Sequence, residues 1–405
     1  WTGNYFCGKL SRHPFGCVEI RKICGGVLAV LILAETGIHG IVSITDNGTA
    51  NRDIYVESEQ EIGGLLESAG VDQVDYRTAI VNPLVRNEEI LYQLNGMSMY
   101  SSTNTEEMWN FVKNMGFENL ENRFQYAGST EVMDMLLGIR YLFCRNTRTL
   151  HTAYKKIAES QSFDLYENPR ALRSGYMVSD SVLDYAMEGT DPLEVQNRLL
   201  SGIAGKRLYK MQTVNSDTAL IGNTTFNIHL KKGEHGYLYI PGTEPDTVTI
   251  NGQEQKSDYW NNNFLDLGTY NVDTIVQVTT GTGMHEAVLG TYQESELDSI
   301  YEELSSQQMD LKDGKGSISV KKDGILMLSI FYDPDMKVYV DGEKADVKSI
   351  QGLTGVKLSQ GTHIITMKYQ TPGLKTGAVL SILIAGILGI LWYISRRKMG
   401  ISGRL

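Results

Sequence analysis

The 405-residue chain suggests two or three folded units, and its 41% hydrophobic and 21% charged residues are ordinary for a globular protein. Its 37 basic and 48 acidic residues give a net charge of -11, which excludes the basic footprint of a nucleic-acid-binding protein. Four cysteines are too few for a disulfide scaffold.

The first 22 residues, 1–22, are predicted to be a cytoplasmic loop or the end of a preceding helix. The sequence begins with Trp1, and no signal peptide with a basic start and a small-residue cleavage site precedes the first apolar segment. We therefore expect this sequence to be the C-terminal part of a longer protein, with further transmembrane helices before it.

Residues 23–45 are predicted to form a transmembrane helix. The segment Ile23–Ile44 is apolar over 22 residues, about 33 Å of helix, which is enough to cross a bilayer. A buried helix in the core of a large globular domain is the alternative interpretation of this segment.

Glu35 and His39, inside that segment, are the candidate catalytic residues. They lie four positions apart and therefore on the same face of a helix. An ionisable side chain in the hydrocarbon region is costly, so it usually faces a cavity, a partner or a functional path. Two interpretations stay open: a structural bond to a neighbouring helix, or a role near a lipid-linked substrate.

Residues 46–168 alternate between helical and strand patterns, which indicates an α/β subdomain. Ser58 and Glu61 have the spacing of a capping box and predict a helix start. A later helix is expected over 131–137, leading into an apolar strand. Cys144 lies in that strand, and we expect it to be a small buried side chain.

Residues 169–206 are expected to be a helical connection, and residues 207–372 a β-sandwich of jelly-roll type. In the second range the period of the hydrophobic residues changes to two, as in strands. Asn251-Gly252 and Asp341-Gly342 are typical of two-residue hairpin turns. One helix near 294–304 interrupts the strand pattern.

Residues 374–395 are predicted to form a second transmembrane helix, followed by a cytoplasmic basic tail over 396–405. Basic residues also precede the first span, so the positive-inside rule places the region between the spans outside the cytoplasm. That region, 46–373, carries 28 of the basic and 46 of the acidic residues, a net charge of -18. The expected fold is thus a membrane-anchored α+β protein, in which two transmembrane helices flank an extracytoplasmic α/β subdomain and a jelly-roll-like β-sandwich.

The extracytoplasmic region offers few candidates for chemistry. His229 and His235 are too isolated in sequence to form a metal site, and we expect both to be surface hairpin residues. Tyr237 and Tyr239 share a strand face, where core packing is favoured over stacking on sugar rings. The sequence contains no nucleophile-elbow, zinc-protease, P-loop or dinucleotide-binding motif, and we expect no metal and no bound cofactor.

Several segments resemble, in the same order along the chain, the C-terminal half of YfhO-type bacterial membrane proteins. The most distinctive segment is the last one, which leads into the second span. The segments are Gly96–Ser102 (GMSMYSS), Leu136–Tyr141 (LLGIRY), Leu165–Leu172 (LYENPRAL), Asp191–Asn197 (DPLEVQN), Thr249–Gly252 (TING), Leu265–Gly268 (LDLG), Val338–Gly342 (VYVDG) and Gly361–Ile382 (GTHIITMKYQTPGLKTGAVLSI).

The resemblance implies a multi-pass glycosyltransferase of the GT-C type in the bacterial cell membrane. Such an enzyme takes a sugar from a polyprenyl-phosphate carrier and adds it to an envelope polymer, here teichoic or lipoteichoic acid. The catalytic acid is then expected in an outer loop upstream of this sequence, and Glu35 matches an acidic position in the last core helix. The implied partners are membrane lipid, the lipid-linked sugar, the envelope glycopolymer and the preceding transmembrane helices. The alternative is a non-enzymatic, membrane-anchored module that binds glycan or organises the envelope.

Overall fold

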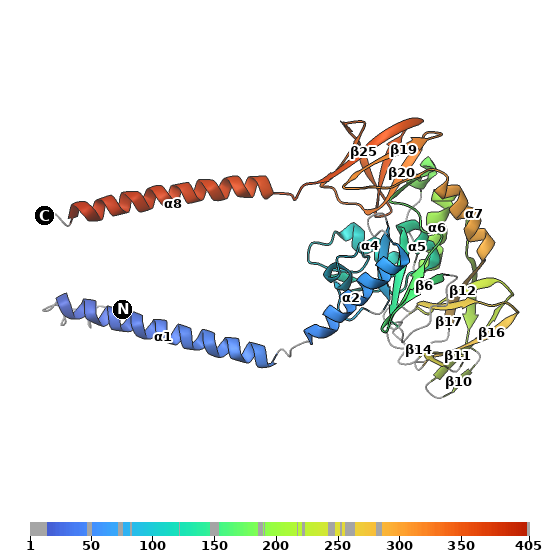
Figure 1. The fold of residues 1–405 in the computed structure, drawn as a ribbon, viewed down its shortest axis with the longest axis horizontal. Helices are drawn as coiled ribbons and strands as arrows, with labels where there is room; N and C mark the ends of the chain where they lie inside the picture. Colours follow the sequence, from blue (N-terminus) through green and yellow to red (C-terminus); the bar gives the residue numbers. More distant parts are fainter. Residues whose placement is uncertain are drawn as a thin grey trace. The chain divides into compact units, whose positions relative to one another are not determined.

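The computed structural model describes residues 14–46, 51–71, 76–81, 83–120, 122–145, 154–184, 189, 191–216, 218–220, 223–241, 248–251, 253–255, 264–280 and 286–402. The chain divides into two compact units, Trp1–Glu59 and Gln60–Leu405. The first unit contains helix α1 (Pro14–Asp46) and the start of α2 (Arg52–Ala69). All other helices and strands belong to the second unit (Figure 1).

Two helices in the described part of the chain are long and apolar enough to cross a membrane. They are the Lys22–Asp46 part of α1 and the Leu374–Ser395 part of α8 (Leu374–Ser402). None of this apolar surface is buried, whereas a helix of a soluble core buries at least one apolar stripe. The two long apolar helices are confirmed, and a buried core helix does not fit either of them. Their insertion into a membrane stays a prediction.

The N-terminal part of the second unit is built on a four-stranded sheet with strand order β1-β5-β7-β6. Strands β1 and β5 are parallel, which requires a long crossover between them. The crossover contains three helices and a small sheet of order β2-β4-β3. The elements are β1 (Arg77–Val81), α3 (Glu88–Leu91), β2 (Met99–Tyr100), α4 (Glu106–Asn114), β3 (Asn119–Leu120), β4 (Arg123–Phe124), α5 (Glu131–Leu137), β5 (Ile139–Arg145), β6 (Lys155–Glu159) and β7 (Phe163–Glu167).

Two antiparallel sheets pack face to face to form what we call the first sandwich. Its core contains Phe226, Ile228 and Leu230 from one strand, because alternate side chains of a strand share a face. One sheet has the order β15-β12-β17-β9, with β9 (Lys210–Asn215), β12 (Glu234–Tyr239), β15 (Phe264–Thr269) and β17 (Glu286–Gln293). The other has the order β10-β11-β16-β13-β14, with β10 (Thr218–Leu220), β11 (Asn223–Leu230), β13 (Val248–Ile250), β14 (Gln253–Gln255) and β16 (Thr274–Thr280).

A second sandwich, formed by β8 and by strands that follow the first sandwich in the chain, has its own core. Its central strand β20 is covered on both faces, with Leu326 in the sandwich core and Ile325 in the neighbouring core, which explains its nearly continuous apolar sequence. One sheet has the order β18-β8-β20-β24-β23, with β8 (Gly175–Val178), β18 (Gln308–Met309), β20 (Gly324–Phe331), β23 (Val347–Ile350) and β24 (Leu353–Leu358). The other has the order β19-β25-β21-β22, with β19 (Lys315–Val320), β21 (Met336–Val340), β22 (Glu343–Lys344) and β25 (Gly361–Tyr369).

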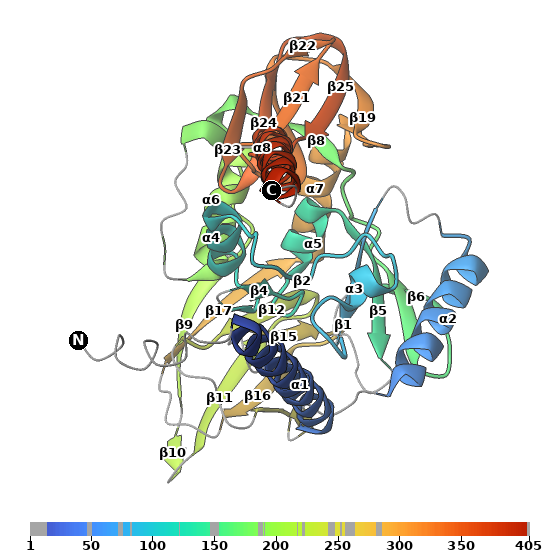
Figure 2. The ribbon, with the colours of Figure 1, turned by 90° about the vertical axis from the view of Figure 1, so that its left-hand side faces the viewer.

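The largest hydrophobic core lies between the two sandwiches, where helices fill the space (Figures 1 and 2). These helices are α4, α5, α6 (Pro192–Ala204) and α7 (Glu294–Ser305). Tyr237 and Tyr292 enter this core from the first sandwich, and Ile325 and Met327 enter it from the second. The candidate site described below lies in this core.

The α+β class is confirmed, together with several local predictions. Gly138 ends α5 with a φ of 70°, a left-handed conformation that glycine adopts without steric cost. The turn residues Asn251 and Asp341 have positive φ values of 51° and 53°, as two-residue hairpins require. Cys144 is fully buried, as its apolar strand predicted.

Other sequence expectations differ from the structure. The predicted capping box was wrong, because α2 already begins at Arg52; Glu61 instead accepts hydrogen bonds from Ser160 and Ser162. The range 169–206 also contains strand β8, whose four residues are too few to show a period of two. The strands of 207–372 form two separate pairs of sheets, and the jelly-roll label stays a prediction.

Candidate functional site

The two residues singled out from the sequence, Glu35 and His39, lie one turn apart on α1 and are exposed. Within the described part of the chain, neither side chain makes a hydrogen bond or an ion pair. The structure therefore shows no bonded partner for either side chain among the described residues, and their role stays a prediction.

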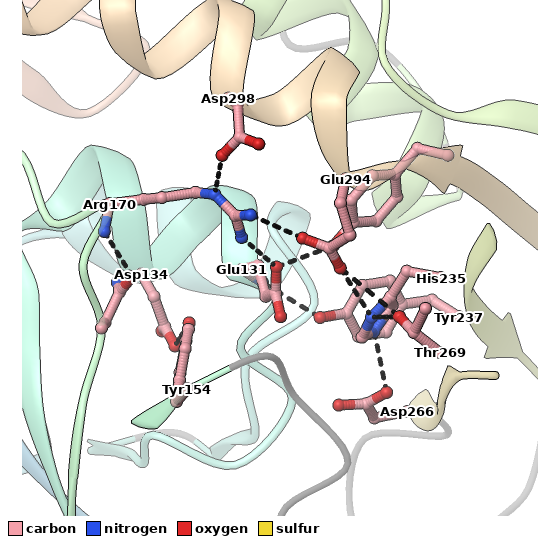
Figure 3. Close-up of polar contacts among 12 residues, drawn as sticks. Glu131, Asp134, Tyr154, Arg170, His235, Tyr237, Asp266, Thr269, Glu294 and Asp298 are labelled. Atoms are coloured by element: carbon pink, nitrogen blue, oxygen red, sulfur yellow. Dashed lines mark hydrogen bonds and ion pairs between the residues drawn. The ribbon is translucent and has the colours of Figure 1, made fainter. Parts of the chain in front are cut away.

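The most elaborate polar site lies in the large core of the second unit, where charged side chains from distant parts of the chain meet (Figure 3). They come from α5, the loop after β7, strands β12 and β15, and α7. We call them the Glu131 cluster, which consists of Glu131, Arg170, His235, Asp266, Glu294 and Asp298.

Arg170 is the central cation of this cluster. Its Nη1 donates to Glu131 Oε2 at 3.1 Å, its Nη2 lies 2.7 Å from Glu294 Oε2, and its Nε donates to Asp298 Oδ1 at 2.7 Å. The Glu131 side chain is only 1% exposed, and a buried charge is tolerated only when it is paired. Burial opposes the charge of Arg170, but the carboxylates of Asp298, Glu294 and Glu131 raise its pKa.

His235 is the second cation, and it is fully buried. Its Nε2 lies 2.9 Å from Asp266 Oδ1, and its Nδ1 lies 3.0 Å from Thr269 Oγ1 and 3.6 Å from Glu294 Oε1. Burial lowers the pKa of His235, but the carboxylates of Asp266, Glu294 and Glu131 outweigh it and raise the pKa to about 10. The imidazole is therefore protonated at neutral pH.

The expectation that both histidines lie on a hairpin surface was wrong for His235. Strand β12 is an inner strand of its sheet, paired with β15 and β17, and helices cover its outer face. His229, on β11, is exposed as expected. The sequence pattern around His235 could not show which face of β12 the helices cover.

Two tyrosines close the cluster toward the first sandwich. Tyr292 donates its hydroxyl to Glu131 Oε2 at 3.0 Å, and the hydroxyl of Tyr237 accepts a hydrogen bond from the Glu131 backbone N–H at 3.0 Å. Tyr237 is 1% exposed, so core packing is confirmed over sugar stacking; Tyr239 is partly buried. Burial raises the pKa of the Tyr237 and Tyr292 hydroxyls well above their usual value, so both stay neutral.

Asp134, one turn after Glu131 on α5, forms a second buried acidic site. Its carboxylate accepts hydrogen bonds from Tyr126 and Tyr154 at 2.8 and 2.6 Å and from Ser129 at 2.5 Å. Burial raises the pKa of Asp134 to about 7, although these three hydroxyl donors lower it. Asp134 therefore changes charge near neutral pH.

The cluster also offers a group of ligand types that a metal ion favours. One atom each of Glu131, His235 and Glu294 lie within 4.8 Å of one another. Arg170, however, already contacts both carboxylates, and a protonated imidazole offers donors, not metal ligands. The described residues thus fit an ion-pair cluster better than a metal site.

The segments that carry the family resemblance supply two of the six residues of the Glu131 cluster. Arg170 belongs to Leu165–Leu172 and Asp266 to Leu265–Gly268. Gln196, in a third segment, donates from Nε2 to the Met115 carbonyl at 2.9 Å. These polar residues satisfy buried groups of the fold and do not form an open reactive site.

A family model described as "Bacterial membrane protein YfhO" matches residues 17–381. The chain belongs to this YfhO family of bacterial membrane proteins. An "Uncharacterized protein YfhO" of Bacillus subtilis (strain 168) is 23% identical over 377 residues, which cover 79% of this chain and 43% of that protein. The chain therefore spans less than half of the length of this curated relative.

Solved structures show only weak similarity to the chain. A GH2 beta-galacturonidase from Eisenbergiella tayi bound to glycerol has a TM-score of 0.15 at 9% identity, covering 41% of this chain and 37% of that chain. A beta-glucuronidase from an uncultured Clostridium sp. has a TM-score of 0.13 at 10% identity, covering 53% and 38%. At these scores neither fold nor activity transfers to this chain.

Proposed function

We propose that the chain is the C-terminal part of a multi-pass glycosyltransferase of the bacterial cell membrane. The enzyme transfers a sugar from a polyprenyl-phosphate carrier to an extracytoplasmic envelope polymer such as teichoic or lipoteichoic acid. The observation that carries this proposal is the family match over residues 17–381, together with a folded region between two apolar helices. The basic residues outside both helices favour an extracytoplasmic position for that region.

In this proposal the folded region shapes access of the acceptor polymer, and the catalytic acid lies in the part of the protein that precedes this chain. The Glu131 cluster supports such a division of roles. Its acids are paired with Arg170 or His235, and Glu131 is also buried, so they are not free to accept a proton from an acceptor hydroxyl. The cluster holds the folded region together, and the transfer step takes place elsewhere.

Glu35 is the residue of this chain that we assign to the membrane part of the site. It lies within the apolar stretch of α1, where a carboxylate is costly unless it serves a polar path or partner. In the assembled enzyme it lines the path of the lipid-linked sugar or orients a neighbouring helix that does.

A transfer assay on membranes that contain the full-length protein tests the proposal. Labelled polyprenyl-phosphate sugar and acceptor polymer are supplied, and transferred label is measured for wild type, Glu35→Gln and the same-helix control Thr36→Val. We expect Glu35→Gln to reduce transfer at unchanged expression and Thr36→Val to match wild type. If Glu35→Gln and wild type transfer equal amounts of label, the role of Glu35 is structural. If the wild type transfers no label, the enzymatic proposal is contradicted.

A further inference from the structure

A small cavity at the start of β1 is lined by residues of the N-terminal sheet region and of the second sandwich. Its volume is about 150 Å³, and its polar lining includes Tyr76, Arg77, Asn95, Ser174 and Ser329. Since one water in the liquid takes up about 30 Å³, the cavity has room for a phosphate-sized group.

Arg77 is the charged residue that lines this cavity, and no carboxylate in the described part of the chain pairs with it. Its Nη1 donates to the Leu137 carbonyl at 3.1 Å, which is the one hydrogen bond of its guanidinium in the described part of the chain. A guanidinium has five N–H donors, so most of them are left for another acceptor. Burial lowers the pKa of Arg77 to about 10, partly offset by the Tyr176 phenol.

Several other partly buried arginines of the described chain do pair with a carboxylate. Arg140 pairs with Glu167 at 2.8 Å, and Arg86 pairs with Glu118 at 3.4 Å. Acids outnumber bases by 46 to 28 over residues 46–373, so a carboxylate partner for Arg77 would be easy to provide. Among the described residues no carboxylate pairs with Arg77, and its guanidinium lines the cavity.

The side chains of Ser174 and Ser329 also line the cavity and provide hydroxyl groups. The Ser329 hydroxyl makes a long hydrogen bond of 3.3 Å to the Ser174 carbonyl, and the Ser174 hydroxyl has no hydrogen bond within the described chain. Gly138 and Leu172 also line the cavity, and a Cβ at Gly138 would lie 2.6 Å from the Leu172 carbonyl oxygen. A planar guanidinium flanked by hydroxyl donors suits a tetrahedral oxyanion.

We propose that this cavity binds a single phosphate group, held by the Arg77 guanidinium and by the hydroxyls of Ser174 and Ser329. The group belongs to a free phosphate, a monoester or a diester, and the cavity recognises the chemistry that the three share. Because the surrounding region is strongly acidic, binding depends on these local donors and not on long-range attraction. The inference does not rest on the proposed glycosyltransferase activity.

Binding is measured on the whole chain in detergent, by calorimetry and by thermal unfolding at constant ionic strength. The probes are inorganic phosphate, glycerol 3-phosphate, a glycerophosphodiester and, for comparison, acetate. We expect saturable phosphate binding that raises the unfolding temperature above that in chloride. The ester that binds most tightly identifies the source of the group.

The variants separate binding from folding. Arg77→Gln keeps one donor for the Leu137 carbonyl and is expected to weaken phosphate binding about tenfold or more, since it removes charged hydrogen bonds. Ser174→Ala, whose hydroxyl supports no bond in the fold, is expected to weaken it about threefold, and Arg86→Gln to leave it unchanged. Should Arg77→Gln fail to fold, Ser174→Ala alone still tests the site. Equal binding by Ser174→Ala and wild type, equal effects of acetate and phosphate, or no phosphate-specific stabilisation overturns the proposal.

Discussion

Arg170 and Glu131 form the central ion pair of the second unit, with Arg170 Nη1 donating to Glu131 Oε2 at 3.1 Å. Glu131 begins α5, and Arg170 lies in the loop that follows β7. The same guanidinium reaches Glu294 and Asp298 on α7. One side chain therefore connects the N-terminal sheet region to the helix that follows the first sandwich, through the core that both share.

Replacement of this arginine should be strongly destabilising. Arg170→Gln leaves the Glu131 carboxylate buried without its cation, which costs about 3–5 kcal/mol in the free energy of unfolding. Denaturant unfolding of the chain in detergent measures the loss. Arg198→Gln is the control, because its ion pair with Glu194 is partly exposed to solvent and contributes about 1 kcal/mol or less. Equal losses in the two variants would contradict a central role for Arg170.

Stability should also depend on pH through His235. Its pKa is about 10 in the folded chain and about 6.5 in the unfolded chain, so folding increases its affinity for the proton. The stabilisation is complete below about pH 6.5 and is lost as pH rises toward 10. We expect the unfolding temperature of the wild type to fall across this window, and that of His235→Gln to fall less. The variant His229→Gln, at an exposed position, should show the same pH dependence of the unfolding temperature as the wild type. Parallel curves of unfolding temperature against pH for wild type and His235→Gln would show that His235 does not cause the dependence.

Asp134 gives a pH dependence in a different window. Its folded pKa of about 7 lies above its unfolded value of about 3.9, so ionisation destabilises the folded state progressively between these values and no further above them. Asp134→Asn removes this penalty. We expect the variant to be least stable, relative to wild type, near pH 4 and to gain a few kcal/mol relative to wild type by pH 8. A stability difference that does not change with pH would show that Asp134 keeps one protonation state.

Two helix-ending glycines form a matched pair. Gly138 and Gly70 have similar φ values of 70° and 63°, but a Cβ at Gly138 meets the Leu172 carbonyl oxygen at 2.6 Å and one at Gly70 meets nothing within 4 Å. Gly70→Ala should therefore cost only the left-handed strain, about 1–2 kcal/mol, and Gly138→Ala clearly more. Denaturant unfolding compares them, and similar losses would mean that the backbone near Leu172 shifts freely.

The sequence predicts features that depend on neighbouring residues better than contacts between residues that are far apart in the chain. The helix ending at Gly138 and the hairpin turns at Asn251 and Asp341 are set by neighbouring residues, so their patterns predict them. The Glu131 cluster is not predicted, because Arg170 and His235 meet only after the helices cover β12. Two of its members, Arg170 and Asp266, lie in segments that resemble a known family, but the resemblance did not reveal their contacts.

The glycosyltransferase assignment is tested most directly by the sugar content of the envelope polymer in cells that lack the full-length protein. We predict that deletion of its gene removes a sugar substituent from the polymer and that the wild-type gene restores it. Glu35→Gln should restore it only in part. Unchanged sugar content after deletion, together with glycan binding by the purified protein, would contradict the account and establish a non-enzymatic envelope module instead.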